Sequence, residues 1–331
     1  PIASSAASDV YKRQVMKFPI LIPNIFNYPF TYESKLNLKI GDFVEVPFGK
    51  SKKIGVVWDY FENDNNKNYK TKKIIRKLEI PQLKKKTLDF LNWFSEYNIV
   101  PKGMALKLAL LSGKPVSILD KKFYDEFSFK LNKNSFQLNS EQKKSLAEIN
   151  DMNKKFNVHV LQGTTGSGKT IVYFEALKHI LQKGYQGLIM LPEIGLTNQF
   201  EKKFFEFFGF KAAIWHSGIT KKNKEIIWSG ITNGEISVVI GARSSLFLPF
   251  KNLGLIIVDE EHDQSYKQDQ GIIFNARDMA ISRASFENIP INLITSVPSI
   301  ETYENIRKKK YTSSKLVRRY QNASLPNYET V

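Results

Sequence analysis

The second part of the chain has a regular alternation of hydrophobic and polar positions. From residue 138 onward, short apolar runs alternate with longer stretches in which apolar residues recur every three or four positions. The apolar runs cover residues 158–161, 188–191, 212–215, 237–240, 255–258 and 291–294. Buried strands that alternate with helices are typical of a parallel sheet covered on both faces. We therefore predict an α/β domain with a doubly wound parallel sheet over residues 138–312.

The residues before position 138 show a different pattern of apolar and polar positions. Residues 43–46 and 54–58 are short β-type runs, and glycine and proline residues bound them. Apolar residues at helical spacing follow over residues 87–97. This pattern predicts a small β-rich domain with helices over residues 15–112. Residues 113–137 show no strong period, and we expect a linker there.

Composition and charge narrow the class of protein. The 331 residues allow about two domains, and 49 lysines and arginines against 32 aspartates and glutamates give a net charge of +17. Between residues 17 and 112 the count is 17 basic against 9 acidic residues, and between 138 and 310 it is 22 against 18. The excess positive charge therefore lies in the N-terminal region, which favours nucleic acid as a partner.

Other features of the sequence exclude several classes of protein. No run approaches the 18 apolar residues of a membrane span, so we expect no membrane partner and a cytoplasmic location. The chain has no cysteine and only four scattered histidines, so we expect no zinc site in it. Residues 4–14 look like the translation of a sequencing-library adapter, so we expect residues 1–14 to be disordered and outside the fold.

Residues 163–170 fit the phosphate-binding loop GxxxxGK[ST], with an apolar run before them and a helical pattern after them. Glycines let backbone N–H groups turn toward phosphate oxygens, and the helix that follows points its positive end at them. Lys169 would hold the β- and γ-phosphates, and the Thr170 hydroxyl would bind Mg²⁺. The expected nucleotide-binding residues of the loop are Gly163, Thr164, Thr165, Gly166, Ser167, Gly168, Lys169 and Thr170.

A second motif follows the apolar run 255–258 and reads Asp259, Glu260, Glu261, His262. Carboxylates that end a buried strand lie at the carboxyl edge of the sheet, where ligands bind. Asp259 would orient Mg²⁺ together with Thr170, and Glu260 would position or deprotonate the attacking water. We therefore expect nucleoside-triphosphate hydrolysis, with Lys169, Asp259 and Glu260 as the catalytic residues.

Kinases and small GTPases share these two motifs, but the sequence DEEH resembles the second signature of superfamily-two helicases. Residues 138–142, about 20 positions before the loop, look like the glutamine element of those enzymes. The amide of Gln142 can both donate to and accept from the edge of adenine, which favours ATP as the nucleotide.

Further segments resemble the primosomal protein N′ (PriA) family of replication-restart helicases. They are residues 30–32, 41–49, 55–57, 191–197, 216–218, 241–247, 259–268, 276–278 and 298–301. The resemblance runs from Met16 to the end of the chain. It implies a RecA-like first lobe in a 3′→5′ DNA helicase that recognises stalled forks and reloads the replisome. Forked and single-stranded DNA, primosome proteins and single-strand-binding proteins are the implied partners.

The resemblance also implies DNA contacts. The N-terminal domain of the family binds the 3′ end of the nascent leading strand, and residues 265–274 match an aromatic-rich loop that couples DNA binding to ATP hydrolysis. The residues implied in DNA binding or coupling are Phe30, Tyr32, Arg243, His262, Tyr266, Lys267 and Arg277.

Three departures from the family pattern stand out. Thr31 replaces the aspartate that the family commonly has between the two aromatics of its 3′-end pocket. Residues 295–297 read Thr-Ser-Val where the family has Ser-Ala-Thr before a proline. The segment 113–137 is too short for the family's winged-helix domain, which we expect to be reduced or absent.

The family has a second lobe with an arginine that reaches the γ-phosphate, and a cysteine-rich zinc module. We expect both in a half that this chain lacks, with residues 313–331 beginning the linker to it. A chain without that arginine should bind ATP weakly and hydrolyse it poorly. Two alternatives stay open: a generic superfamily-two DNA or RNA translocase, and a fork-binding module without productive ATP turnover.

Overall fold

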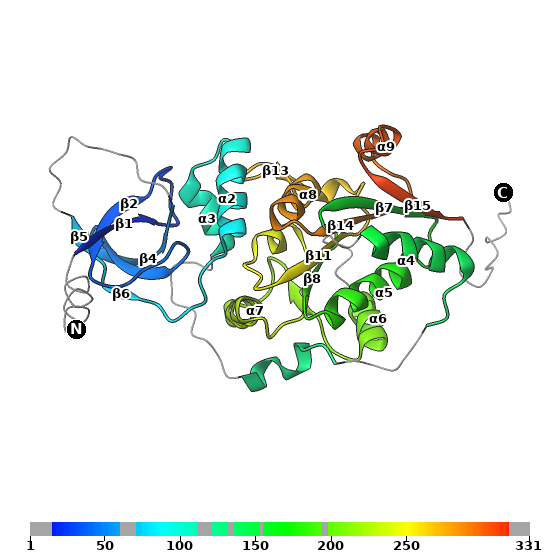
Figure 1. The fold of residues 1–331 in the computed structure, drawn as a ribbon, viewed down its shortest axis with the longest axis horizontal. Coiled ribbons are helices and arrows are strands. Elements are labelled where there is room, and N and C mark those ends of the chain that lie inside the picture. Colours follow the sequence, from blue (N-terminus) through cyan, green and yellow to red (C-terminus); the bar gives the residue numbers. More distant parts are fainter. Residues whose placement is uncertain are drawn as a thin grey trace, which may run out of the picture. The chain divides into compact units, whose positions relative to one another are not determined.

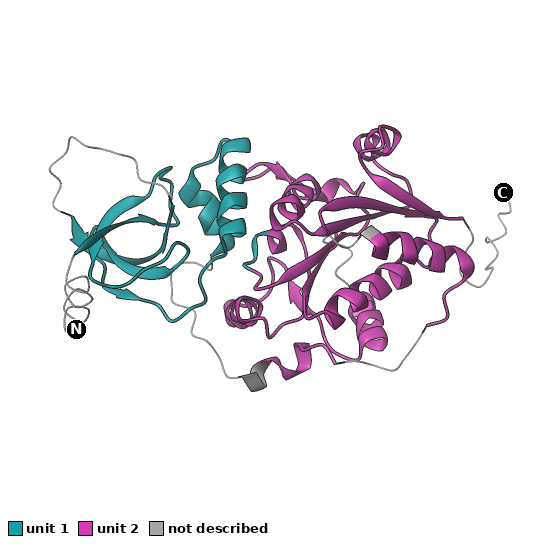
Figure 2. Cartoon of the chain, in the orientation of Figure 1, with its two compact units in different colours: residues 1–119, 247–249 teal, residues 120–246, 250–331 magenta. Residues whose placement is uncertain are grey.

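The computed structural model describes residues 15–59, 71–110, 121–130, 136–152, 155–192 and 198–317 (Figure 1). They fall into two compact units, each with its own sheet (Figure 2). The first unit comprises residues 1–119 and 247–249, and the second comprises residues 120–246 and 250–331. Residues 1–14, for which we predicted disorder, lie outside the described part.

The first unit is built on a six-stranded sheet with the order β5-β2-β1-β4-β3-β6. The strands are β1 (Met16–Leu21), β2 (Phe30–Ser34), β3 (Phe43–Phe48), β4 (Ser51–Val57), β5 (Lys72–Lys73) and β6 (Arg76–Lys77). All neighbours pair antiparallel except β2 and β5. Alternate side chains such as those of Val44 and Val46 enter one buried core. The predicted β-rich domain is therefore confirmed.

Among its described residues, this unit also contains the helices α2 (Lys85–Tyr97) and α3 (Lys102–Ala109). Leu88, Leu91 and Phe94 recur at helical spacing along α2, and all three are buried. Pro101 precedes the first residue of α3, where its fixed φ angle suits the start of a helix.

The second unit contains a seven-stranded parallel sheet with the order β15-β7-β14-β11-β8-β10-β9. Each of the six predicted apolar runs overlaps one of its strands. The strands are β7 (Asn157–Gly163), β8 (Gln186–Met190), β9 (Ala213–Trp215), β10 (Val238–Gly241), β11 (Leu253–Val258), β14 (Pro290–Thr295) and β15 (Thr312–Leu316). The predicted RecA-like doubly wound fold is confirmed.

Helices connect these strands and cover the sheet (Figure 1). They are α4 (Ser140–Met152), α5 (Lys169–Gln182), α6 (Asn198–Phe208), α7 (Lys221–Asn233), α8 (Ala276–Glu287) and α9 (Ile300–Arg307). Leu255 and Ile257 of β11 join one core with residues of α5 and α6. Ile256 and Val258 alternate with them and face the other side of the sheet, and α8 packs against β11.

In the part of the chain that the structure describes, 3₁₀ segments and a small hairpin lie between these elements. The 3₁₀ segments are η1 (Lys121–Phe127), η3 (Arg243–Phe247) and η4 (Gln264–Tyr266). The hairpin pairs β12 (Lys267–Gln268) with β13 (Phe274–Asn275). None of the described helices is long and apolar enough to cross a membrane.

The structure corrects the predicted linker over residues 113–137. Residues 121–127 form η1, in which the Tyr124 side chain is fully buried. Ser128 Oγ donates to Glu235 O at 3.0 Å, and Phe129 N donates to Ser237 Oγ at 2.8 Å. This part of the segment therefore belongs to the second unit, and its irregularly spaced aromatics gave no periodic signal.

The structure also corrects the boundary at residue 312. Residues 312–316 form β15, an edge strand of the sheet that pairs with β7. The strand is mostly polar, so its sequence lacks the apolar run by which the other strands were recognised. Its last residue, Leu316, lies beside Gly163 at the start of the phosphate loop.

Candidate nucleotide-binding site

The phosphate loop joins the end of β7 to the start of α5. Gly166 and Gly168 have φ angles of 82° and 84°, in the left-handed region that glycine tolerates best. A Cβ atom on Gly166 would meet nothing within 4 Å, so the loop is open above this residue. The loop therefore presents its backbone at the N-terminus of a helix, where anions bind.

Lys169 lies in the first turn of α5 and folds back over the loop. Its Nζ donates to Gly163 O at 2.6 Å, and Thr164 O lies 3.4 Å away. These carbonyl oxygens hold the ammonium group beside the loop, as expected for a phosphate-binding lysine.

The side chain of Gln142 is hydrogen-bonded to the backbone of this loop. Asn139 and Gln142 form a capping box at the start of α4: Gln142 N donates to Asn139 Oδ1 at 2.9 Å, and Asn139 N donates to Gln142 Oε1 at 3.0 Å. Gln142 Nε2 donates to Ser167 O at 3.1 Å, and the side chain is fully buried. Both ends of the amide are used within the protein, so this geometry does not support the prediction that Gln142 reads adenine.

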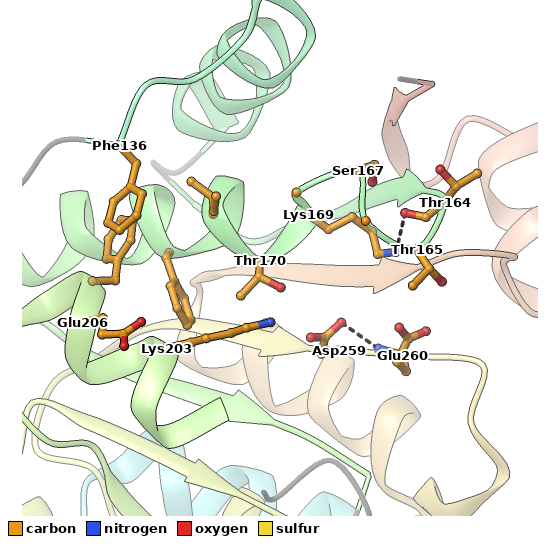
Figure 3. Close-up of a pocket in the computed structure, with 15 residues that line it drawn as sticks. Phe136, Thr164, Thr165, Ser167, Lys169, Thr170, Lys203, Glu206, Asp259 and Glu260 are labelled. Atoms are coloured by element: carbon orange, nitrogen blue, oxygen red, sulfur yellow. Dashed lines mark hydrogen bonds between the residues drawn. The ribbon is translucent and has the colours of Figure 1, made fainter. Parts of the chain in front are cut away.

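A cavity of about 470 Å³ opens beside the loop (Figure 3). The loop lies on one side of it, and Asp259 and Glu260, just beyond β11, lie on the other. The structure thus brings together the predicted residues of both motifs. The other lining residues are Phe136, Ile171, Phe174, Lys203, Glu206 and Phe207.

An aromatic pair borders the far part of this cavity. The rings of Phe136 and Phe207 are stacked, with centroids 5.0 Å apart and planes 10° apart. Phe207 is buried in α6 and belongs to the hydrophobic core of the second unit. The sequence did not reveal that Phe136, from the expected linker, lines this cavity.

Asp259 is held by two hydrogen bonds. Tyr173 Oη donates to its Oδ2 at 2.9 Å, and the backbone N–H of Glu260 donates to its Oδ1 at 3.0 Å. Burial raises the pKa of Asp259 to about 6, although the bond from Tyr173 opposes this shift. Glu260 has a φ angle of 47°, which is uncommon for a residue other than glycine and occurs often at functional sites.

His262 connects the acidic motif to the end of β14. Its Nδ1 lies 2.8 Å from Thr295 Oγ1, and the Thr295 hydroxyl donates to Val297 O at 2.7 Å. His262 Nδ1 also lies 3.7 Å from Glu260 Oε2. The motif that departs from the family pattern therefore keeps a direct contact with the second signature through Thr295.

Two residues predicted to bind DNA are buried. The Arg277 side chain is 8% exposed, and its guanidinium bonds to Glu261, Asp278 and Ser299. Tyr266 is 1% exposed, and its hydroxyl lies 2.6 Å from Asp259 O and 3.0 Å from Met190 O. Neither side chain is available to contact DNA directly, which corrects the direct DNA contact; the coupling role implied for both residues stays a prediction.

Arg243 and Lys267 are more accessible. Arg243 Nη1 donates to Lys267 O at 3.1 Å, and the Lys267 side chain is exposed. Two of the residues implied in DNA binding or coupling therefore lie side by side. Of the matched segment 191–197, residues 193–197 lie outside the described residues.

Of the two aromatics assigned to the 3′-end pocket, Phe30 is accessible and Tyr32 is not. Phe30 is half-buried and makes edge contacts with Phe26 and Phe48. Tyr32 is 4% exposed in the core of the sheet, and its hydroxyl donates to Pro47 O at 3.0 Å. The structure therefore corrects Tyr32 from a ligand-contacting residue to a core residue, while Thr31 between them is exposed.

Comparison with known families identifies both units. Residues 19–111 match the PriA 3′ DNA-binding domain (3′BD), and residues 139–304 match the DEAD/DEAH box helicases. The chain belongs to the DEAD/DEAH box helicase family. The same chain contains a helicase lobe and a PriA-type domain, which confirms the resemblance found in the sequence.

Several replication restart proteins named PriA are homologous to this helicase chain. The protein of Rickettsia conorii is 41% identical over 321 residues, which cover 96% of this chain and 48% of the relative. The protein of Bacillus subtilis is 38% identical over 174 residues, which cover 53% of this chain and 22% of the relative. The Haemophilus influenzae protein is 28% identical and covers 92% of the chain and 51% of the relative. The chain spans about half the length of the Rickettsia relatives that it matches.

Solved helicase structures are also similar to this helicase. The UvsW helicase from bacteriophage T4 aligns with a TM-score of 0.40 and 17% identity, covering 61% of this chain and 68% of that chain. A hypothetical ATP-dependent RNA helicase from Sulfolobus tokodaii aligns with a TM-score of 0.40 and 18% identity, covering 54% of this chain and 53% of that chain.

Proposed function

We propose that this chain is the DNA-end-binding domain and the first motor lobe of an ATP-dependent 3′→5′ DNA helicase that acts in replication restart. The observation that carries the proposal is the cavity in which the phosphate loop faces Asp259 and Glu260, in a chain whose residues 19–111 match a 3′ DNA-binding domain. The polarity and the role in restart rest on the homology to PriA proteins.

The residues of the cavity fit ATP and Mg²⁺. The volume of about 470 Å³ is within the range of small-molecule sites. Among the described residues, Ser167 Oγ is buried without a hydrogen-bond partner, and Lys169 stands beside it in the open loop. The stacked rings of Phe136 and Phe207 offer an apolar surface suited to a base.

Each residue has a distinct role in hydrolysis. Lys169 holds the β- and γ-phosphates, and Thr170 and Asp259 would hold Mg²⁺, which would supply positive charge to neutralise the phosphates. Glu260 accepts the proton of the attacking water. Tyr173 orients the Asp259 carboxylate through its hydroxyl group.

We expect this chain by itself to bind ATP weakly and to turn it over slowly. Lys169 and Lys203 are the cations among the described residues that line the cavity, and an arginine at the γ-phosphate is worth about 10³–10⁵ in turnover in related enzymes. Steady-state ATP hydrolysis, measured with and without single-stranded DNA, tests this expectation. A DNA-stimulated rate similar to that of ordinary helicases would contradict it.

Recognition of a 3′ end separates the proposed function from a generic translocase. We expect the chain to prefer forks that carry a free 3′-hydroxyl on the leading strand over matched forks whose end is blocked by a 3′-phosphate. A competition experiment with both labelled forks measures this preference. Equal affinity would favour a generic DNA or RNA translocase.

The other alternative is a fork-binding module without productive ATP turnover. A Glu260→Ala variant distinguishes this alternative, because Glu260 is the base in the proposed reaction. The variant should keep fork binding and lose the residual ATP turnover. An unchanged turnover would mean that hydrolysis is not intrinsic to this chain. Forked DNA, single-stranded DNA, primosome proteins and single-strand-binding proteins remain the proposed partners.

A further inference from the structure

Helix α8 carries two buried charges that oppose its dipole, although Asp278 in its first turn follows the dipole and pairs with Arg277 at 2.8 Å. Arg277 lies in its first turn and Glu287 in its last, although cations are disfavoured at the N-terminus of a helix and anions at the C-terminus. Both residues are 7% exposed, so solvent does not compensate for this arrangement. Their positions must therefore be stabilised by partners within the protein.

The Arg277 end of α8 is bonded to the acidic motif. Arg277 Nη1 donates to Glu261 Oε2 at 3.1 Å and to Ser299 Oγ at 2.7 Å. Glu261 is 1% exposed, and it follows Glu260 directly in the chain. Ser299 N donates to Glu261 Oε1 at 2.8 Å, so the carboxylate is fixed from both sides. A shift of this end of α8 would therefore displace the residue beside Glu260.

The other end of α8 is bonded to η3. The fully buried Arg283 donates from Nη1 to Leu246 O at 2.5 Å, and its Nη2 lies 3.3 Å from Glu287 Oε1. A buried ion pair is rarely more stabilising than apolar residues of the same size. We therefore interpret the Arg283–Glu287 pair as a means of holding Arg283 against the Leu246 carbonyl, and not as a source of stability.

A second connection joins η3 to the nucleotide site. Arg243, at the start of η3, donates to Lys267 O at 3.1 Å. The adjacent Tyr266 lies with its hydroxyl 2.6 Å from Asp259 O. The segment that carries Arg243 is thus linked to Asp259 on one side and, through α8, to Glu261 on the other.

We propose that α8 couples DNA binding at η3 to the nucleotide site, and that Arg283 is the positioning residue that fixes η3 to this helix. The inference rests on the proposed function, because it requires Arg243 and its neighbours to contact DNA. About 9 Å of rigid helix separates Arg277 from Arg283, from a rise of about 1.5 Å per residue. A displacement of η3 by DNA is therefore transmitted to Glu261 as a movement of the whole helix.

The test is the effect of DNA on nucleotide affinity. The affinity of the full chain for a fluorescent, non-hydrolysable ATP analogue with Mg²⁺ is measured with and without saturating oligo(dT). We expect DNA to change the affinity of the original chain about fivefold or more. We call the affinity with DNA divided by the affinity without DNA the coupling ratio. In Arg283→Met and Arg283→Lys this ratio should fall to about one, while the affinity measured without DNA stays within about twofold of that of the original chain.

Two further variants separate coupling from folding. The double variant Arg283→Met, Glu287→Met removes the charge pair while it preserves apolar packing, so its melting temperature should recover toward that of the original chain. A merely structural role predicts that the coupling recovers too, whereas the proposal predicts that it stays near one. Arg307→Met removes an exposed arginine–glutamate pair on α9 and should keep the original ratio.

The possible failures are distinguishable. If the original chain does not bind the analogue, the proposed function fails. If it binds both ligands but shows no coupling, or if the Arg283 variants keep the coupling, the role of α8 is overturned and the proposed function stands. If the single Arg283 variants do not fold, the double variant and Arg277→Lys decide: a retained ratio overturns the proposal, and a ratio near one supports it.

Discussion

Asp259 shows how much of the site depends on residues outside the motifs. The sequence predicts its position at the carboxyl edge of the sheet, because a buried apolar strand precedes it. Its two hydrogen bonds come from Tyr173, which lies one turn after Thr170, and from the backbone of Glu260. The spacing places Tyr173 on the same helix face as Lys169 and Thr170, but spacing alone does not say what its hydroxyl contacts.

Gln142 and Tyr32 illustrate the opposite case, in which the residue type suggested a ligand and the structure gives a supporting role. The Gln142 amide completes a capping box and holds the phosphate loop, while the Tyr32 ring fills the core of the first sheet. Polar side chains that satisfy buried backbone groups look the same in the sequence as side chains that bind a ligand.

Replacing Tyr173 with phenylalanine should weaken Mg²⁺-dependent ATP binding. The change removes a hydrogen bond to a carboxylate, a loss of about tenfold in affinity at neutral pH. The bond also lowers the pKa of Asp259, so without it more of this carboxyl is protonated near pH 7 and cannot bind Mg²⁺. Titrations at several pH values measure the effect, which should shrink above pH 8.

A matched control is Tyr185→Phe, which changes an exposed tyrosine. It should leave the affinity and its pH dependence unaltered. For the original chain, Mg²⁺-dependent affinity should rise as the pH increases through about 6, because the pKa of Asp259 is raised to about 6 by burial. Tyr173→Phe with unaltered affinity across this range would contradict the role assigned to the hydroxyl.

At the scale of elements, the sequence predicts those strands of the parallel sheet that are apolar on both faces and misses β15, which is mostly polar. The six buried strands of the parallel sheet are found because α/β sheets are covered on both sides. The edge strand β15 is missed because its side chains include Thr312 and Ser314, which bond to the two ring nitrogens of His159 at 2.9 Å each. Its pairing with β7 is a tertiary effect that no local pattern reports.

The burial of His159 makes the stability of the fold dependent on pH. Burial lowers the pKa of His159 to about 4, below the ordinary value of 6.5. The unfolded chain therefore binds this proton more readily, and the free energy of unfolding decreases as the pH falls from 6.5 to 4. The decrease from this histidine is about 1.4 kcal/mol per pH unit, on the order of 3 kcal/mol in all.

Denaturant unfolding of the original chain and of His159→Gln at pH 4.5, 5.5 and 7 measures this contribution. The variant should be less stable at pH 7, because it loses the contacts of the imidazole ring with β15. Its free energy of unfolding should decrease less steeply as the pH is lowered. The same slope in both proteins would show that the pKa of His159 is the same in the folded and unfolded chains, and would contradict the lowered pKa.

At the scale of the whole molecule, the sequence separates two regions by pattern and by charge, and the structure contains two compact units. The excess of basic residues lies in the N-terminal region, whose residues 19–111 match a 3′ DNA-binding domain. The more evenly charged region carries the nucleotide site. The expected linker was the least predictable part, because Tyr124 and Phe136 each find a position in the second unit without any periodic signal.

The central claim is that the phosphate loop and the acidic motif form one ATP site in a DNA-binding chain. Calorimetric titration with Mg²⁺ and a non-hydrolysable ATP analogue tests it most directly, with the original chain and Lys169→Ala compared side by side. We predict measurable binding of the analogue to the original chain. Lys169→Ala should lower the affinity for the analogue by about tenfold to a hundredfold, as expected for the loss of charged hydrogen bonds. The variant should bind single-stranded DNA as tightly as the original chain does. Equal affinity of both proteins for the analogue would contradict the account.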